Sequence, residues 1–149
     1  MFGDLKADRG QINHLARFRL FLTNGLTQAL AATGRPVLVD LGAGGEEEAR
    51  VRRAIAAVPS SGNISVWNGS FANFASSISA ASLYVGYDSS GQHAAAVFGI
   101  PRLTVFAGYP NERFLARWRP DGKGQSHTVL ATAPGPAIAA FNAALAALI

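Results

Sequence analysis

The sequence predicts an α/β fold, a three-layer, Rossmann-like domain in which helices cover both faces of a parallel sheet. Short apolar runs of strand length alternate along the chain with longer segments whose apolar residues recur every three or four positions. Glycine, proline and other turn-forming residues separate the two kinds of segment. Chains that alternate strand and helix in this way form parallel sheets with right-handed helical crossovers.

The composition fits one domain spanning residues 1–149 with a real hydrophobic core. Hydrophobic residues make up 49% of the chain and charged residues 15%, a balance typical of ordered globular proteins. No apolar run is long enough to cross a bilayer, and the first residues lack the basic and apolar regions of a signal peptide. The chain also has no cysteine. We therefore expect a cytoplasmic protein without disulfides.

The first half of the chain predicts alternating helices and strands. Residues 11–32 carry apolar side chains at helical spacing, and Gly34 and Pro36 end that segment. Residues 37–41 form a continuous apolar run, typical of a strand buried on both faces. After the glycine-rich turn 42–45 we predict a helix over 46–58, a strand over 64–67 and a helix over 70–80 capped by Ser70.

The second half continues the alternation. We predict a strand over 83–87, a small-residue helix over 90–98 stopped by a Gly-Ile-Pro sequence, and a strand over 103–106. An arginine-rich loop through Pro120 and a short strand over 128–130 follow. Pro136 opens a terminal helix with one apolar face.

The most informative stretch runs from the strand over 83–87 into Asp88-Ser89-Ser90-Gly91-Gln92-His93. In doubly wound folds, ligands bind where the carboxyl end of a strand leads into a helix. The amino terminus of that helix presents free N–H groups and the positive end of its dipole to an anion. Ser89 and Ser90 add hydroxyl donors, and His93 falls within the first turn. The alternative is that a serine only caps the helix.

The glycine-rich turn over 42–45 is followed by Glu46-Glu47-Glu48 and lacks the G-x-G-x-x-G spacing. Three acids at this place would repel a pyrophosphate, although they favour the dipole of the helix that they open. Two explanations of the three acids stay open. They stabilise the helix dipole only, or one of their carboxylates accepts hydrogen bonds from ribose hydroxyls.

Other patterns exclude some classes of function. The three histidines have no metal-ligand spacing, and we expect no metal and no cofactor. Ser89 with His93 could suggest a nucleophile and its base, but no G-x-S-x-G elbow is present. The net charge of +4 suits a small anionic ligand, a nucleic acid or an anionic membrane surface equally. Basic and aromatic residues are not interleaved as a platform for single-stranded nucleic acid requires, so we expect no nucleic-acid partner. The group Arg113, Arg117, Trp118 and Arg119 is interpreted as a solvated loop around one buried tryptophan or as a contact with an anionic acceptor or membrane surface, which we expect to be peripheral at most.

Residues 34–120 resemble the C-terminal half of glycosyltransferase family 9, the ADP-heptose:lipopolysaccharide heptosyltransferases. In that family a strand leads into D-[ST]-G-x-x-H, small residues, L-G-x-P and a strand ending in F-G. The matching segments here are Asp88 to His93, Ala94-Ala95-Ala96, Phe98-Gly99-Ile100-Pro101 and Val105-Phe106-Ala107-Gly108. Ser90 stands where the family has glycine, and Gly91 follows it.

The resemblance implies the C-terminal, donor-binding domain of a GT-B enzyme, which transfers a sugar from a nucleoside diphosphate to a lipopolysaccharide-type acceptor. It implies that an ADP-heptose-like donor is the small-molecule partner. The diphosphate would contact Ser89, Ser90, Gly91 and His93. The sugar would contact Asp88, the ribose Glu46, the adenine side Asn68 and Gly69, and the donor phosphate Lys6.

The family's N-terminal domain, which supplies the acceptor site and the catalytic base, is not matched by this chain, so no residue is assigned as catalytic. A separate N-terminal domain or self-association through the face left uncovered is therefore expected. Two alternatives stay open at this point. One is a nucleotide-binding module without catalysis, and the other is a GT-B domain of the UDP-sugar epimerase kind.

Overall fold

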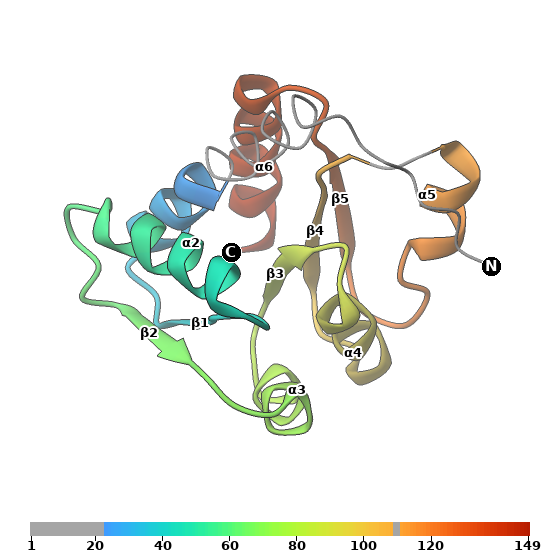
Figure 1. The fold of residues 1–149 in the computed structure, drawn as a ribbon. Helices are drawn as coiled ribbons and strands as arrows, with labels where there is room; N and C mark the ends of the chain where they lie inside the picture. The colour runs from blue at the N-terminus through green and yellow to red at the C-terminus, as the bar shows by residue number, and fades with distance from the viewer. Residues whose placement is uncertain (1–22, 109–110) are drawn as a thin grey trace.

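The computed structural model describes residues 23–108 and 111–149, and in these ranges strands and helices alternate along the chain (Figure 1). A helix over residues 23–32 precedes β1 (Val37–Asp40), α2 (Gly45–Ala56), β2 (Ile64–Trp67), α3 (Phe71–Ser79) and β3 (Tyr84–Tyr87). The chain continues with α4 (Ser90–Phe98), β4 (Arg102–Phe106), α5 (Glu112–Trp118), β5 (Ser126–Leu130) and α6 (Pro134–Leu148). Lys6 and the first part of the helix predicted over 11–32 lie outside the described residues.

The described strands pair in parallel, as predicted, but in two sheets. β1 pairs with β2, and β4 lies between β3 and β5 in a three-stranded sheet. The expected single sheet therefore differs from the structure. Alternation along the sequence predicts the number and direction of strands, whereas pairing of neighbours depends on contacts between distant segments.

Helices cover both faces of the three-stranded sheet, which gives this part of the molecule three layers (Figure 1). On one face, the helix over 23–32 and α6 pack on β4 and β5 through a cluster that includes Leu26, Leu103 and Phe141. On the other face, α3 and α4 pack on β3 through Ile78, Tyr84 and Ala95. Burial of these two clusters supplies the main driving force for folding.

β1 is less buried than its apolar run predicted. Leu38 on β1 is 44% exposed, and Val66 on β2 is 45% exposed. A continuous apolar run is a good indicator of a strand, but it does not reveal that the strand belongs to a narrow two-stranded sheet.

The arginine-rich segment predicted as a loop contains the helix α5. Asn111 caps it, since its side chain accepts a hydrogen bond from the Phe114 N–H at 2.9 Å. Phe114 and Trp118 stack one helical turn apart with ring centroids 5.8 Å apart, and Leu115 is buried. Trp118 itself is 42% exposed rather than buried. The helical spacing of these residues is easily missed in the sequence, because Arg117 interrupts the short apolar segment and further arginines flank it.

A buried arginine fixes the loop between α5 and β5. Arg102 on β4 is 2% exposed, and its guanidinium donates hydrogen bonds to the carbonyl oxygens of Lys123 (2.8 Å) and Pro120 (3.4 Å). Burial lowers the pKa of Arg102, and the negative charge of Asp121 opposes this shift. Since arginine stays charged at neutral pH, these carbonyl groups solvate a cation inside the protein.

Candidate functional site

The helix that follows β1 and the carboxyl ends of β3 and β4 meet at a small cavity. Its volume is about 160 Å³, and Glu47, Arg50, Tyr87, Asp88 and Ala107 line it. Glu47 and Arg50 come from α2, Asp88 follows β3 and Ala107 follows β4. The cavity therefore lies at the carboxyl ends of parallel strands, the place where α/β proteins bind ligands.

The first turn of α4 opens next to this cavity with unused hydrogen-bond donors. Ser89 occupies the N-cap position, but its side chain accepts no N–H from the helix. Within the part of the chain that the structure describes, no acceptor bonds the backbone N–H groups of Ser90 and Gly91. The two N–H groups and the positive end of the helix dipole favour an anion at this turn.

The Tyr84 hydroxyl is the hydrogen-bond partner of the Ser89 hydroxyl and fixes its position. Tyr84 is 8% exposed, and its hydroxyl lies 3.3 Å from Ser89 Oγ. A side chain at Gly86 would meet one edge of the Tyr84 ring, and a side chain at Gly91 would meet the other edge. The hydroxyl end of the Tyr84 ring therefore fits only because neither glycine carries a side chain. The Ser89 hydroxyl lies against Tyr84 and does not cap α4.

Burial raises the pKa of the Tyr84 hydroxyl, the hydrogen bond with Ser89 lowers it by a smaller amount, and the charge of Asp40 raises it further. The folded protein therefore keeps this proton at a pH where the unfolded chain has lost it. The contribution of Tyr84 to the free energy of unfolding is complete below about pH 10, and it is lost as the pH rises through the raised pKa.

We expect the free energy of unfolding of the unmodified chain to fall more steeply than that of Tyr84→Phe above about pH 10, by up to about 1.4 kcal/mol per pH unit. At neutral pH the variant should lose about 1 kcal/mol with the hydrogen bond. Urea unfolding from neutral to alkaline pH measures both effects. Parallel pH curves for the two proteins would contradict the raised pKa.

His93 is oriented by Gln92 and Trp118. Gln92 is fully buried, and its Nε2 donates to the Trp118 carbonyl oxygen at 3.2 Å and lies 3.5 Å from His93 Nε2. The buried amide of Gln92 therefore contacts the His93 ring at Nε2. The edge of the Trp118 ring contacts His93, with ring centroids 5.4 Å apart, and the Trp118 Nε1 donates to the Asp88 carbonyl oxygen at 3.2 Å. These hydrogen bonds and the ring contact connect α5 to the turn before α4 and to its first turn.

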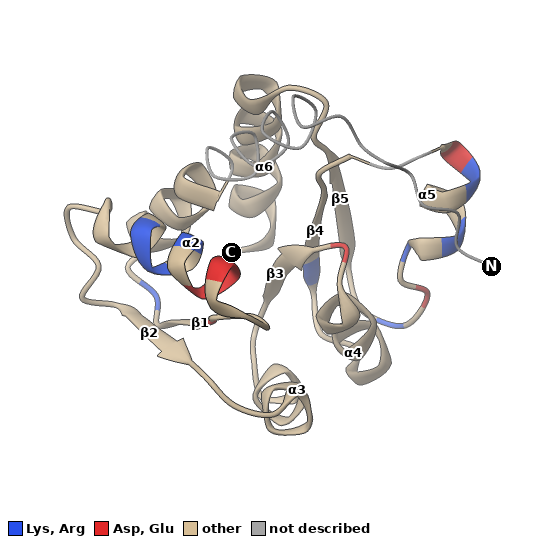
Figure 2. Ribbon diagram, viewed as in Figure 1, with Lys and Arg blue, Asp and Glu red and all other residues tan. Residues whose placement is uncertain are grey.

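The acidic first turn of α2 supplies the opposite wall of the cavity. Figure 2 shows acidic residues at the start of α2 and basic residues in its later turns. Arg50 pairs with Glu47 at 3.5 Å, and a side chain at Gly42, where φ is 75°, would collide with the Glu47 carboxylate. The Asp40 carboxylate tightens the same turn by accepting the Gly42 N–H at 3.1 Å. Gly42 therefore lets the turn after β1 lie directly against Glu47.

The predicted site residues do not all gather at the cavity. Asp88 lines it, and Ser89, Ser90, Gly91 and His93 follow on the adjoining turn of α4.

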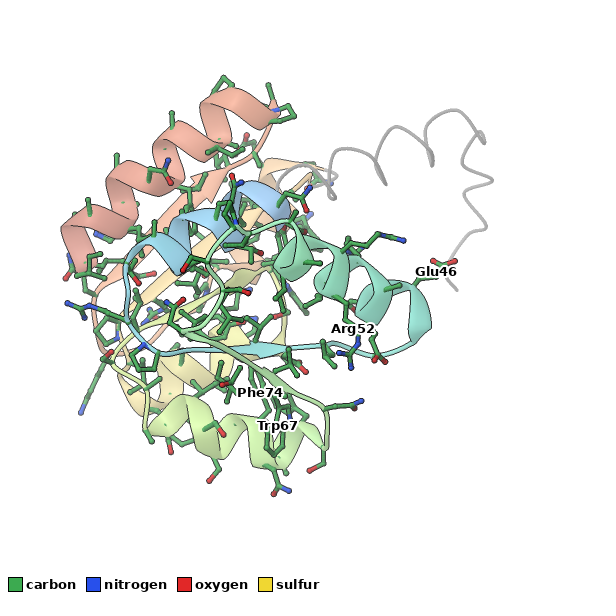
Figure 3. The ribbon with its side chains drawn as sticks, turned by 90° about the vertical axis from the view of Figure 1, so that its left-hand side faces the viewer. Glu46, Arg52, Trp67 and Phe74 are labelled. Atoms are coloured by element: carbon green, nitrogen blue, oxygen red, sulfur yellow. The ribbon has the colours of Figure 1, made fainter. Side chains whose placement is uncertain are left out.

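Glu46 is exposed at the start of α2, where Figure 3 shows its carboxylate pointing away from the sheet, and it does not line the cavity. Asn68 and Gly69 are exposed on the turn after β2, where the absence of a side chain at Gly69 leaves room for the Trp67 ring. Lys6 is not among the described residues.

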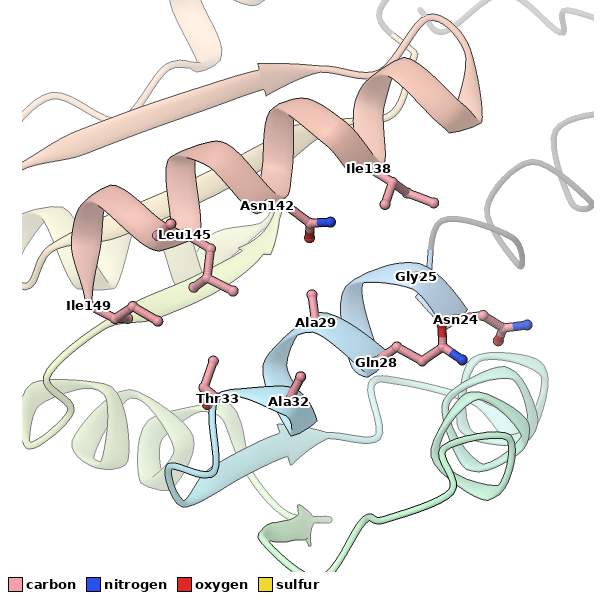
Figure 4. A pocket seen from close by; sticks show the side chains of 11 residues that line it. Asn24, Gly25, Gln28, Ala29, Ala32, Thr33, Ile138, Asn142, Leu145 and Ile149 are labelled. Atoms are coloured by element: carbon pink, nitrogen blue, oxygen red, sulfur yellow. The ribbon is translucent and has the colours of Figure 1, made fainter.

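A larger cavity, of about 630 Å³, lies between the helix over 23–32 and α6 (Figure 4). The two helices approach closely where Gly25 faces Ile138, and the cavity extends from there to Ile149. Its lining is uncharged, and none of the predicted site residues belongs to it. We therefore place the candidate site at the smaller cavity, where charged groups and helix N–H groups converge.

The described residues contain no group of three or more histidine, cysteine, aspartate or glutamate side chains arranged to hold a metal ion. Among these same residues, no helix has the length and apolar character needed to span a bilayer. Comparison of the chain with protein-family models, with curated proteins and with solved structures finds no match.

Sequence reasoning assigned no role to Tyr84 and Gln92, did not single out Glu47 from the neighbouring acids, and did not place Trp118 beside His93. Tyr84 and Gln92 sit among apolar and small residues, as ordinary core residues do, and only the fold reveals what their polar ends contact. The one available signal was the pair of glycines that flanks the Asp88–Ser90 segment, because glycine often marks a close approach of another group.

Proposed function

We propose that this domain binds a nucleoside diphosphate sugar and acts as the donor-binding part of a glycosyltransferase. The observation that carries the proposal is the first turn of α4, where the N–H groups of Ser90 and Gly91 are unbonded beside a cavity with carboxylate walls. The N–H groups and the serine hydroxyls suit a diphosphate, and the carboxylates suit sugar hydroxyls. The sequence resemblance supports the same assignment.

The chemistry follows from these positions. In sugar transfer, the bond between the anomeric carbon and the β-phosphate oxygen breaks, and an acceptor hydroxyl forms a new bond to that carbon. Negative charge accumulates on the leaving diphosphate. The α4 N–H groups, the Ser89 hydroxyl and a ring N–H of His93 would stabilise that charge through fixed donors. The acceptor's proton is taken up by a base that we do not assign to this chain.

The first test is calorimetric titration of the full chain with ADP, UDP and GDP. We expect saturable binding with a preference for ADP, and His93→Ala should weaken it by about 5- to 150-fold, the range for a lost charge-assisted hydrogen bond. His127→Ala is the matched control, since His127 lies on β5 and its Nε2 is 3.1 Å from Gln125 Nε2, away from the cavity lining. Absence of binding to all three nucleotides would overturn the proposal.

A second pair of variants tests which glutamate accepts hydrogen bonds from the sugar hydroxyls. Glu46 was assigned to the ribose from the sequence, whereas Glu47 lines the cavity. We expect Glu47→Gln to weaken ADP binding by about tenfold or more, the cost of replacing a charged acceptor. Glu46→Gln, one position away on the same helix, should bind as the unmodified chain does. A loss in Glu46→Gln alone would instead restore the assignment made from the sequence.

A further inference from the structure

The side of the molecule formed by α5, the loop after it and the end of α4 is both basic and apolar. Figure 2 shows basic residues along α5 and along the loop that runs from α5 past α4. Residues 112–123 contain four cations and two acids. The cations are Arg113, Arg117, Arg119 and Lys123, all of them exposed. We call this side the basic–apolar surface.

The arginines of this surface differ from those of α2 in their partners. On α2, Arg50 and Arg52 pair with Glu47 and Glu48 at 3.5 Å and 2.8 Å. In the described part of the chain, Arg113, Arg117 and Arg119 form no ion pair. Arg113 and Arg117 lie one turn apart and thus on the same side of α5. Among the described residues no acid pairs with these arginines, so their charges can attract an anionic partner.

Exposed apolar side chains lie on α4 and α5, the two helices that the basic loop contacts. Val97 is 80% exposed and Phe98 48%, both on α4, and Trp118 of α5 is 42% exposed. The loop joins them, because Gly122 packs against Ala96 of α4 and Gly124 against Gly99. Arg102 holds the same loop from inside through the Lys123 and Pro120 carbonyl oxygens. The surface is therefore a fixed part of the fold.

We propose that the basic–apolar surface binds an anionic lipid bilayer. Arginine and lysine are attracted to acidic headgroups, and a tryptophan at the rim of a basic patch suits the boundary between headgroups and acyl chains. A nucleic acid would use the cations but gains little from Val97, an aliphatic side chain. The Trp118 Nε1 and carbonyl oxygen are bonded to the Asp88 carbonyl and to Gln92, so the bilayer would lie beside the first turn of α4.

The test is co-sedimentation of the full chain with vesicles of phosphatidylcholine alone and of equal parts phosphatidylcholine and phosphatidylglycerol. We expect binding to the anionic vesicles only, with release at high salt because the attraction is screened. Arg113→Gln combined with Arg117→Gln should reduce binding by about tenfold or more. Val97→Ser should also reduce it. Thermal melts establish that each variant is folded.

The control is Arg52→Gln combined with Arg53→Gln, which removes the same charge from exposed positions of α2. This control should bind anionic vesicles as the unmodified chain does. The proposal is overturned by equal binding to both kinds of vesicle, by no binding, or by equal losses in the two double variants. Binding to duplex DNA in place of vesicles, with the same loss in the α5 variant, would assign the surface to nucleic acid and equally overturn it. Neither nucleotide binding nor its absence affects these outcomes.

Discussion

Phe141→Ala is expected to lower the free energy of unfolding by about 3–5 kcal/mol, the usual cost of removing a fully buried phenylalanine. Phe141 is 0% exposed and lies in the core where α6 and the helix over 23–32 pack on β4 and β5. The loss has two sources: apolar contacts are removed, and a cavity is left that the packed helices cannot fill by moving. Urea unfolding monitored by circular dichroism measures it.

The control for this variant is Phe71→Ala. Phe71 is 48% exposed at the start of α3, so its truncation should cost less than about 1 kcal/mol. Similar losses in the two variants would mean that α6 does not carry the central core of the domain.

Gly91→Ala is expected to weaken ADP binding by more than about tenfold and to lower the free energy of unfolding by about 1–3 kcal/mol, the typical cost of overpacking. The added methyl group would collide with one edge of the Tyr84 ring, whose other edge faces Gly86. The ring has no free space to yield into, so Ser89 and the first turn of α4 must shift.

Calorimetry and thermal melts measure the two effects together. Gly135→Ala on α6 is the matched control, because a side chain there meets no atom within 4 Å. It should leave ADP binding unchanged and keep or slightly raise stability through better helix propensity. If Gly91→Ala bound ADP normally, the Tyr84–Ser89 arrangement would not support the site.

Local patterns predicted most of the described elements. The bounds of β2 and α4 were predicted as observed, and Ser70 caps α3 through the Asn73 N–H at 3.4 Å. These features depend on residues close together in the chain. Strand termini followed by turn residues also predicted that Asp88 and Ser89 would stand at the edge of a parallel sheet.

Features that depend on distant residues were not predicted. α5 was taken for a loop, because its apolar segment is short and flanked by arginines, and its Trp118 finds partners in Asp88 and Gln92, far back in the sequence. The choice between Glu46 and Glu47 depends on which side of α2 faces β3, and sequence spacing alone does not place a helix relative to a strand that follows two elements later. The division into two sheets is hidden for the same reason.

That division has a consequence for ligand binding. The described strands form one ladder through β1 and β2 and another through β3, β4 and β5, so backbone hydrogen bonding does not tie the two ladders into one cooperative network. Glu47 lies on α2, which connects the two strands of the first ladder, and Asp88 directly follows β3 of the second. A ligand that contacts both Glu47 and Asp88 would connect the two ladders. Because it binds only when they are correctly placed, its binding free energy would add to the free energy needed to separate them.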